Sequence, residues 1–527
     1  MAIRVYNTLS RTREPLETVA PGKVGIYLCG PTVYKPSHIG HMVGPVIFDA
    51  IKRYLAYSGF EVTLVINITD IDDKLIAESA RRGIPMPALA EDMAADYHAN
   101  LEAMGIDSVD HFPRATQHIA DIIEFTRDLV QKGFAYQSDG DVYFEVERDP
   151  HYGKLSRRSV AELHGEGGEM AQRKRSAADF ALWKSAKPGE PSWPSPWGNG
   201  RPGWHIECSA MSRKLLGETF DIHGGGLDLV FPHHENEIAQ SECRHGKPLA
   251  RYWLHNGLMQ ASNEAGKLGG RSTRPLDAPG AQAGEQAAQE AGKMAKSKGA
   301  TAFSELLTRY QPEAIRFFLL STHYRHPIDY SEDRIAEVEK GLDTFYRFFK
   351  RYARITGQSF YDVAAPGRRD EREAAGAFAE HRRRFLESMD DDFNTGGAIG
   401  DLFELVRALN KLADERDLEN SGRGDAEAMR LLREGTVTLR ELAATLGLFR
   451  RPVESRGGGG ELVNKLMELM IHVRADARKS KNFAMADKIR QGLSELGITL
   501  EDRPSGTDWT MEKAEGRRQK NESGSGF

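Results

Sequence analysis

The sequence predicts an α/β protein whose first part builds a parallel sheet and whose second half is helical. Two apolar runs, 25–30 and 62–68, lie on either side of an amphipathic stretch over 43–57. This strand–helix–strand order is typical of a Rossmann-type parallel sheet with a crevice at the carboxyl ends of its strands. After Thr301 apolar residues recur with helical spacing, which predicts an all-α region from about 310 to 450.

Changes in composition divide the chain into segments. A stretch rich in Pro, Gly and Trp closes an insertion over 135–200, and residues 261–292 are rich in Ala, Gly and Gln. Four glycines, 457–460, mark a flexible joint before a small basic module. We expect these segments: 1–134, first half of the sheet domain; 135–200, insertion; 201–260, second half; 261–292, low-complexity insertion; 293–345, a lysine loop and the region after it; 346–454, an α-helical bundle; 455–510, a small C-terminal helical/mixed domain; 511–527, a disordered tail.

Length and composition exclude several classes of protein. The 527 residues, 40% apolar and 28% charged, describe a soluble globular chain of about three or four domains. No run approaches the roughly 18 apolar residues of a membrane span, and the N-terminus lacks a signal-peptide segment. Three cysteines are too few for a disulfide scaffold, so we place the chain in a reducing cytoplasm. The net charge of −6 excludes a uniformly basic nucleic-acid binder, but not a local basic patch.

The stretch Ser37–Met42, SHIGHM, lies where the first predicted strand gives way to the first helix. A helix N-terminus offers unpaired N–H groups and a positive dipole end to phosphate. His38 and His41 can both face such a ligand, and Gly40 lets a flat ligand approach the backbone. The alternative is that the two histidines only begin the helix, one of them as its cap.

A lysine-rich loop follows the low-complexity insertion. Residues Lys293–Gly299 read KMAKSKG. Lys293 and Lys296, on a mobile loop, can close over a triphosphate and neutralise the charge of departing pyrophosphate. Taken alone, the loop is more typical of a solvated surface.

Four residues far apart in the sequence carry metal-ligating side chains. Cys29 ends the first strand, Cys208 follows a Trp-His-Ile-Glu stretch, and His233 and Glu237 share one face of a helix that starts at Pro232. Two thiolates, an imidazole and a carboxylate make a reasonable zinc set, although their spacing is not that of a zinc finger. The alternative is two small buried cysteines beside a solvated helix start.

Together these motifs resemble signatures of class I aminoacyl-tRNA synthetases. HIGH matches His38–His41, and KMSKS matches Lys293–Ser297 with Ala295 in place of its first serine. Longer stretches are similar to the cysteinyl-tRNA synthetase family, and the likeness runs from near residue 3 to about 510. They are LCGPTVY (28–34), NITDIDDK (67–74), SPWGNGRPGWHIEC (195–208), HGGGLDL (223–229) and LEDRPSGTDW (500–509).

The resemblance implies an enzyme that uses ATP, with Mg²⁺, to activate L-cysteine and then transfers it to tRNA(Cys). One Zn²⁺ per chain would select the cysteine thiolate, the bundle and the terminal module would bind tRNA, and we expect a monomer. The implied roles are catalytic for His38, His41, Lys293 and Lys296; ATP-binding for His38, Gly40, His41, Gly225, Asp228 and Lys296; substrate-binding for Thr69, Trp204 and His223; zinc-binding for Cys29, Cys208, His233 and Glu237; and tRNA-binding for Trp509.

Several residues have simpler interpretations. Asp70, Asp72 and Asp73 suggest magnesium, but we prefer helix N-capping with Lys74 as counterion. Trp204 can be a core tryptophan, and basic residues of the terminal module a solvated helix face. We interpret Cys243, which matches no ligand position, as structural. The basic residues are Arg474, Arg478, Lys479, Lys481, Lys488 and Arg490.

Two other functions compete with this one. A cysteine ligase on the same catalytic core, with an amino sugar as acceptor, would not need the long helical region and the terminal module. An inactive paralogue that only binds RNA would not need His38, His41, Lys296 and the four metal-ligating residues.

Overall fold

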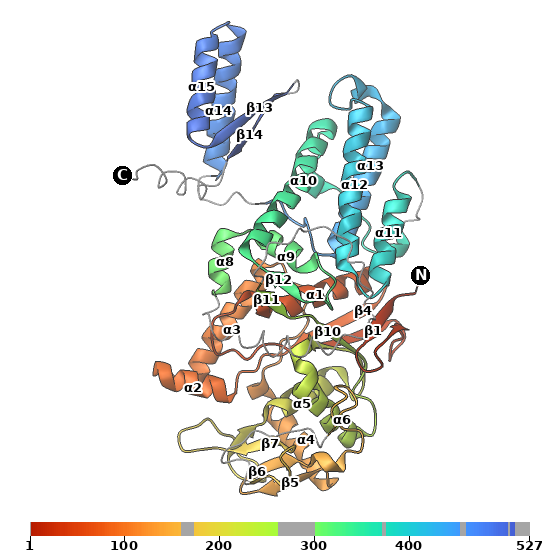
Figure 1. Cartoon of the computed structure of the whole chain (residues 1–527), viewed down its shortest axis with the longest axis vertical. Coiled ribbons are helices and arrows are strands. Elements are labelled where there is room, and N and C mark those ends of the chain that lie inside the picture. The colour runs from red at the N-terminus through yellow and green to blue at the C-terminus, as the bar shows by residue number, and fades with distance from the viewer. Residues whose placement is uncertain are drawn as a thin grey trace, which may run out of the picture.

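A four-stranded parallel sheet lies at the centre of the molecule (Figure 1). The computed structural model describes residues 2–159, 173–261, 301–371, 376–453, 460–503 and 506–511. The sheet confirms the predicted α/β class. Its strands, in spatial order, are β10 (Ala250–Asn256), β9 (Phe220–Gly226), β3 (Lys23–Leu28) and β4 (Glu61–Ile66).

Helix α1 (Ile39–Tyr57) connects β3 to β4 and gives the predicted strand–helix–strand unit. It begins at Ile39 rather than at Val43, because the SHIGHM stretch itself forms the first turn. Helices α2 (Asp73–Arg82) and α3 (Met86–Ala103) follow β4, and a hairpin of β1 (Arg4–Asn7) and β2 (Thr12–Pro15) precedes β3.

Of the three aspartates at the start of α2, only Asp72 acts in capping as predicted. The Asp70 carboxylate instead accepts hydrogen bonds from the backbone N–H of Thr116 at 2.9 Å and from its hydroxyl at 2.5 Å. Asp72 is the N-cap, and its carboxylate accepts a hydrogen bond from the Lys74 backbone N–H at 2.8 Å. The predicted counterion is wrong, however. Asp73 pairs with Lys184 at 2.7 Å and with Arg201, because the inserted sheet brings these two cations against the start of α2.

An antiparallel sheet lies at the lower end of Figure 1 and shares a second hydrophobic core with three helices. Residues of that core include Phe125, Trp183, Ile206 and Ala239. The inserted sheet therefore packs against the helix that precedes it, α4, and the two that follow it, α5 and α6. The strands are β5 (Ala135–Ser138), β6 (Asp141–Phe144), β7 (Phe180–Ser185) and β8 (Gly200–Pro202), and the helices are α4 (Ile119–Gln131), α5 (Trp204–Leu216) and α6 (Glu235–His245).

The chain after residue 301 is helical, with one exception to the predicted all-α region. Strand β12 (Ile328–Tyr330) pairs in parallel with β11 (Met259–Ala261). Pro327 disfavours helix at that point and Ile328 is buried, so the segment extends instead. The helices are α8 (Phe303–Arg309), α9 (Pro312–Leu320), α10 (Glu332–Thr356), α11 (Ala379–Asp390), α12 (Thr395–Glu415) and α13 (Ala426–Thr445).

The C-terminal module has a small core of its own and stands apart from the bundle at the top of Figure 1. Met467, Ile489 and Leu500 belong to that core, and Trp509 packs against it. The elements are α14 (Gly460–Lys479), α15 (Phe483–Glu495), β13 (Ile498–Arg503) and β14 (Gly506–Met511).

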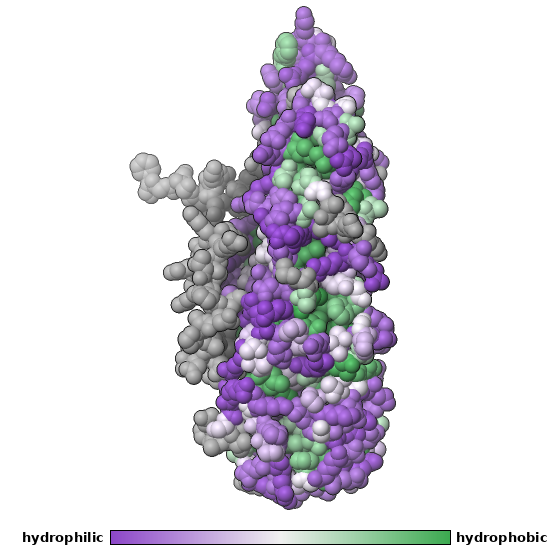
Figure 2. All heavy atoms as spheres, turned by 90° about the vertical axis from the view of Figure 1, so that its right-hand side faces the viewer, coloured by the Kyte–Doolittle hydropathy of each residue, from purple (hydrophilic) through white to green (hydrophobic). Residues whose placement is uncertain are grey.

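Short single turns complete the described elements. They are η1 (Ala115–His118), η2 (Val146–Arg148), η5 (Leu227–Leu229), η6 (Val230–His234), η7 (Phe360–Asp362), η8 (Arg369–Glu371) and η9 (Ser421–Gly424). No helix among the described residues is long and apolar enough to cross a membrane. The face seen in Figure 2 is mainly hydrophilic, and its hydrophobic patches are small and separate.

A buried ion pair joins α1 of the sheet domain to the helices after it. The guanidinium of Arg316, on α9, donates to the Asp49 carboxylate on α1 and, at 2.9 Å, to the Leu446 carbonyl after α13. Both side chains are almost fully buried, and Arg53 also donates to Asp49 at 2.8 Å. This contact therefore fixes the relative position of three elements.

Replacement of Arg316 by Met should destabilise this core by about 3–5 kcal/mol, because it leaves the Asp49 charge buried without its main partner. The effect is measured as a lower urea midpoint of the cooperative unfolding transition. Arg383→Met is the matched control, since its pairs with Glu380 and Glu387 are exposed, and its midpoint should stay at the wild-type value. A loss below about 1 kcal/mol for Arg316→Met would contradict the prediction.

Candidate active site

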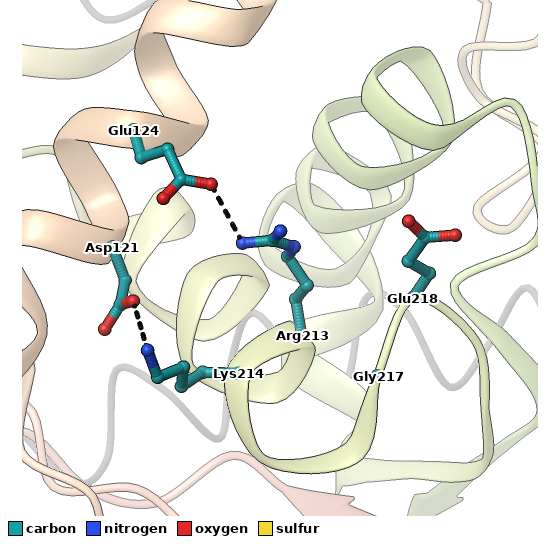
Figure 3. A pocket seen from close by; sticks show the side chains of 6 residues that line it. All are labelled: Asp121, Glu124, Arg213, Lys214, Gly217 and Glu218. Atoms are coloured by element: carbon teal, nitrogen blue, oxygen red, sulfur yellow. Dashed lines mark hydrogen bonds and ion pairs between the residues drawn. The ribbon is translucent and has the colours of Figure 1, made fainter.

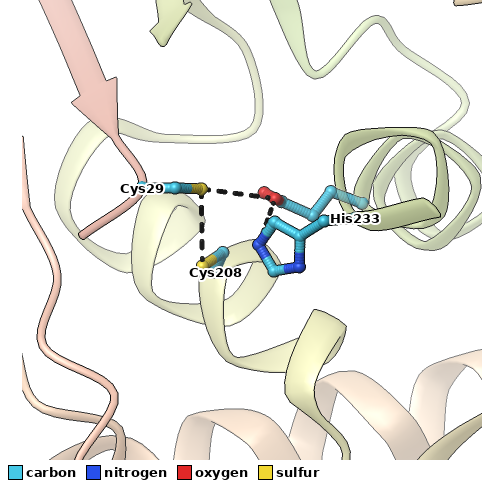
Figure 4. Close-up of side chains that lie close together, drawn as sticks. Cys29, Cys208 and His233 are labelled. Carbon is cyan, nitrogen blue, oxygen red and sulfur yellow. Dashed lines mark hydrogen bonds and ion pairs between the residues drawn. The ribbon is translucent and has the colours of Figure 1, made fainter. Parts of the chain in front are cut away.

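The four predicted metal ligands come together near the carboxyl ends of β3 and β9 (Figure 4). Cys29 Sγ lies 3.8 Å from Cys208 Sγ and 3.5 Å from Glu237 Oε1. His233 Nε2 lies 3.0 Å from the same Glu237 oxygen. Cys208, His233 and Glu237 are buried, and Cys29 is half-buried.

Different elements supply these four side chains. Cys29 directly follows β3, Cys208 lies on α5, and Glu237 lies on α6. Helix α6 starts at Glu235 rather than at the predicted Pro232, because a π-helical turn, η6, precedes it. His233 in that turn and Glu237 in the helix nevertheless meet at hydrogen-bond distance.

The distances from Cys29 to two other donor atoms fit a tetrahedral zinc ion, whereas the 3.0 Å between His233 Nε2 and Glu237 Oε1 is that of a direct hydrogen bond. With Zn–S near 2.3 Å and Zn–O near 2.0 Å, a tetrahedron places two sulfurs about 3.8 Å apart and a sulfur and an oxygen about 3.5 Å apart. The Cys29–Cys208 and Cys29–Glu237 separations are 3.8 and 3.5 Å. The donor set is also one that zinc prefers.

The electrostatics of the cluster favour a cation. The Cys29 thiol donates to Cys208 and thereby lowers the pKa of Cys208 to about 6, while burial raises the pKa of Cys29. Burial opposes the charged form of His233, but the Glu237 carboxylate outweighs it and raises the pKa of His233 to about 10. In the metal-free cluster a protonated His233 therefore lies between the Cys208 and Glu237 side chains, and a bound metal ion would take the place of that proton.

Imidazole and indole rings surround the cluster. His223, fully buried on β9, bonds through Nε2 to Glu237 Oε2 at 2.8 Å. His205 Nδ1 lies 3.0 Å from His233 Nδ1, which fixes the ring of that ligand. Trp204, at the start of α5, lies with its ring 4.3 Å from that of His233 and is 38% exposed. The predicted pocket residues His223 and Trp204 thus both adjoin the cluster.

Thr69 lies beyond the end of β4, with its side chain turned toward α5. Its hydroxyl donates to Glu207 Oε2 at 3.0 Å, and both residues are buried. Burial, reinforced by the neighbouring Cys208, raises the pKa of Glu207 well above its usual value. This pair borders the cluster on the side of Cys208.

The two histidines of the SHIGHM stretch stack at the N-terminus of α1. Their ring centres are 3.8 Å apart, and the His38 backbone N–H donates to His41 Nδ1 at 3.3 Å. A Cβ on Gly40 would lie 2.9 Å from His38 Cε1, so a side chain there would displace the His38 ring. The Phe303 N–H donates to the Ser37 carbonyl at 2.7 Å and ties α8 to this turn. The helix start with one histidine as its cap is confirmed, since His38 is the N-cap of α1, whereas the phosphate-facing role of the two rings stays a prediction.

The glycine stretch after His223 lets the protein's own side chains approach the backbone. A Cβ on Gly224 would lie 2.2 Å from Phe48 Cζ, and a Cβ on Gly225 would lie 2.7 Å from His234 Cε1. Asp228 follows in η5, and burial raises the pKa of its carboxyl group.

Comparison with known proteins identifies the family. A family model described as "tRNA synthetases class I (C) catalytic domain" matches residues 15–268 and 286–340, and a DALR domain model matches 384–450. The chain is 44% identical over 523 residues to the "Cysteine--tRNA ligase" of Geobacter metallireducens, covering 97% of this chain and 100% of that one. The chain belongs to the cysteine--tRNA ligase family. The family member of Thermococcus onnurineus is 43% identical over 511 residues, covering 97% and 99%.

Solved structures support the fold of this family member. Methionyl-tRNA synthetase of Mycobacterium tuberculosis in complex with methionyl-adenylate superposes with a TM-score of 0.58 at 16% identity, covering 80% of this chain and 90% of that chain. The catalytic-domain match is interrupted over 269–285, inside the predicted low-complexity insertion.

Three residues predicted to act in catalysis or tRNA binding, and the cysteine predicted to be structural, do not belong to the metal-ligating cluster of this cysteine--tRNA ligase family member. Lys293 and Lys296 lie outside the described residues. Trp509, on β14, lies opposite Leu500 and packs against the core of the terminal module. Cys243 is half-buried against the second core, and burial raises the pKa of its thiol to about 12.

The basic cluster predicted on the terminal module is partly neutralised. Arg474 forms two hydrogen bonds of 2.6 Å with the Asp502 carboxylate, and Arg478 donates to the same group at 3.2 Å. Lys488 and Arg490 are exposed.

The sequence reasoning did not single out His205, His234 or His255. His234 Nδ1 bonds to His255 Nε2 at 2.8 Å, and His255 Nδ1 bonds to Thr8 Oγ1 at 2.8 Å. The only available signals were proximity to His233 for His234 and to Cys208 for His205. Nothing in the sequence pattern connects His255 with Thr8.

A hollow of about 400 Å³ lies apart from the cluster, between α4 and the end of α5 (Figure 3). Its charges are paired, with Arg213 on Glu124 at 3.2 Å and Lys214 on Asp121 at 3.0 Å. Glu218, on the rim, pairs with Lys247 at 2.7 Å. Because its charged groups neutralise one another, this hollow offers little to a charged ligand.

Burial, with His38 close by, lowers the pKa of His41 to about 3. In the unfolded chain the pKa of a histidine is near 6.5. Between that pH and about 3, His41 is therefore protonated in the unfolded state but not in the folded state, which favours unfolding. The contribution of His41 to stability is therefore present above about pH 6.5 and is lost as the pH falls toward 3. His41→Asn should reduce the loss of stability between pH 7.5 and 5, measured by urea midpoints at both pH values.

His151→Asn serves as the control, because that imidazole is exposed, and it should keep the wild-type pH dependence. An identical pH dependence in wild type and His41→Asn would contradict the prediction.

Proposed function

We propose that this chain activates L-cysteine with ATP to cysteinyl-adenylate and transfers the cysteinyl group to tRNA(Cys). The curated relatives that match it over nearly its whole length are named Cysteine--tRNA ligase. The observation that carries the proposal is the cluster of Cys29, Cys208, His233 and Glu237, because its donors suit an ion that binds the thiol of cysteine.

These four residues would hold one zinc ion. Bound zinc supplies a Lewis acid that takes the substrate sulfur as a thiolate ligand. Serine has a harder and far less acidic hydroxyl, which is a poorer partner for a sulfur-rich zinc. A difference of about 5 kcal/mol in binding free energy corresponds to roughly 5,000-fold discrimination, which lessens the need for editing.

The cysteine lies between the cluster and the neighbouring side chains. Trp204, with 38% of its surface exposed beside His233, offers a flat wall to the amino acid. Thr69 lines the side near Cys208, and His223 closes the side behind Glu237. Together they hold the carboxylate of cysteine toward the nucleotide.

The nucleotide lies at the N-terminus of α1. His38 and His41, uncharged at neutral pH because burial lowers the pKa of each, donate N–H groups to phosphate oxygens beside Gly40. Gly225 and Asp228 hold the adenosine, Lys293 and Lys296 neutralise the departing pyrophosphate, and Mg²⁺ accompanies ATP. The cysteine carboxylate attacks the α-phosphorus, so the chain acts mainly by positioning and charge stabilisation.

The helical segments bind tRNA in the cytoplasm, and the enzyme acts as a monomer. The bundle over 346–454, which includes the DALR match at 384–450, contacts the tRNA body, and the module over 455–510 recognises the anticodon. Trp509 stacks on an unpaired base from its half-buried position on β14.

Cysteine-dependent exchange of pyrophosphate into ATP tests the catalytic half of the proposal. We expect exchange with cysteine and at least 1,000-fold less with serine at equal concentration, since a binding difference of about 5 kcal/mol separates them. A zinc chelator should abolish exchange, and added zinc should restore it.

Cys243→Ser is the matched control, because this cysteine lies outside the cluster, and its variant should keep wild-type exchange. Comparable exchange with serine and cysteine in the zinc-loaded enzyme would refute the selection by zinc.

Truncation after Glu454 tests the tRNA-binding half. The module that it removes has its own core, so the catalytic domain should remain folded and cysteine activation should be unchanged. Charging of tRNA should fall by at least 100-fold, as expected when several contacts of about 1–3 kcal/mol are lost. Full charging by the truncated enzyme would overturn the assignment of this module.

A further inference from the structure

We infer that the chain has a second metal position, formed by Cys29, His223, His234 and Glu237, which overlaps the first. One ligand atom from each of these residues lies within 4.8 Å of the others. The inference rests on the proposed zinc site, because Cys29 and Glu237 belong to both sets. Cys208 and His233 belong only to the first set.

The Glu237 carboxylate lies between the two positions. Its Oε1 lies 3.0 Å from His233 Nε2, and its Oε2 lies 2.8 Å from His223 Nε2. A carboxylate can bind a metal through either oxygen. Glu237 therefore contacts a histidine of each set through a different oxygen.

His234 supplies the distinguishing ligand atom. Its Nδ1 is held by His255, which is itself held by Thr8, with both contacts at 2.8 Å. Its Nε2 is buried, has no hydrogen-bond partner, and lies 4.0 Å from Glu237 Oε1. A buried imidazole with one nitrogen fixed and the other unpaired is the arrangement expected of a metal ligand.

Gly225 makes room for this ring. A Cβ there would lie 2.7 Å from His234 Cε1 and 3.0 Å from His234 Nε2. The close approach of the His234 ring to the β9 backbone therefore requires glycine at this position. The need for glycine at position 225 thus supports the fixed position of the His234 ring separately from the distances between the ligand atoms.

The two sets differ in their sulfur content. The first contains two thiolates and the second contains one, that of Cys29. Loss of Cys208, by substitution or oxidation, should therefore leave a complete four-ligand set of one sulfur, two nitrogens and one oxygen. Loss of Cys29 breaks both sets. The two cysteines should differ in importance for holding the metal.

Cobalt(II) binding to the chelator-stripped, full-length chain under anaerobic conditions tests this asymmetry. Wild type should show a sulfur-to-cobalt charge-transfer band of two thiolates. Cys208→Ser should bind one Co²⁺ per chain with about half that band intensity, and Cys29→Ser should bind at least tenfold more weakly than Cys208→Ser. Equal affinities of the two variants would overturn the second position.

His234→Asn provides the second arm. In the wild-type background it should leave the two-thiolate band unchanged, because His234 is not in the first set. Added to Cys208→Ser, it should weaken Co²⁺ binding at least tenfold, whereas Cys243→Ser added to Cys208→Ser should not. Circular dichroism confirms that each variant is folded. Unchanged affinity of Cys208→Ser/His234→Asn would overturn the inference, while absence of a two-thiolate band in wild type would overturn the proposed zinc site itself.

Discussion

The site depends on the burial of one charge, the carboxylate of Glu237. A carboxylate without solvent exposure costs several kcal/mol unless partners surround it. Here His223 contacts one oxygen and His233 the other, and burial is outweighed so that the pKa of Glu237 lies well below its usual range. The carboxylate thus stays charged. Its hydrogen bonds to His223 and His233 link β9 and the turn before α6 to this group.

This requirement explains why the molecule has two cores that meet at the site. The parallel sheet positions Cys29 and His223, and both Cys29 and Cys208 pack in its core. Helices α5 and α6, which carry Cys208 and Glu237, also contribute side chains to the core shared with the inserted sheet. The inserted sheet therefore acts as part of the scaffold of the site, and Lys184 and Arg201 tie it to α2 through Asp73.

The sequence could predict what depends on local pattern or on motifs. The α/β class, the N-capping by Asp72 and the cluster of four donors are of this kind. Contacts between segments far apart in the sequence could not be predicted in this way. The counterions of Asp73 come from the inserted sheet, and the chain from His234 through His255 ends on Thr8 in the N-terminal hairpin. Pro327 disfavours helix before β12, but the pairing of β12 with β11 is again a contact between distant segments.

The net charge of −6 does not show how the charges are arranged in the fold. Many arginines that composition counts as candidates for RNA contact are paired inside the fold. Arg316 binds Asp49 between the sheet domain and the bundle, Arg382 binds Glu441 at 2.7 Å, and Arg474 binds Asp502. Such pairs hold elements together and contribute no net field. The tRNA binding that we propose must therefore depend on exposed, locally clustered cations, so the total charge of the chain says little about its partner.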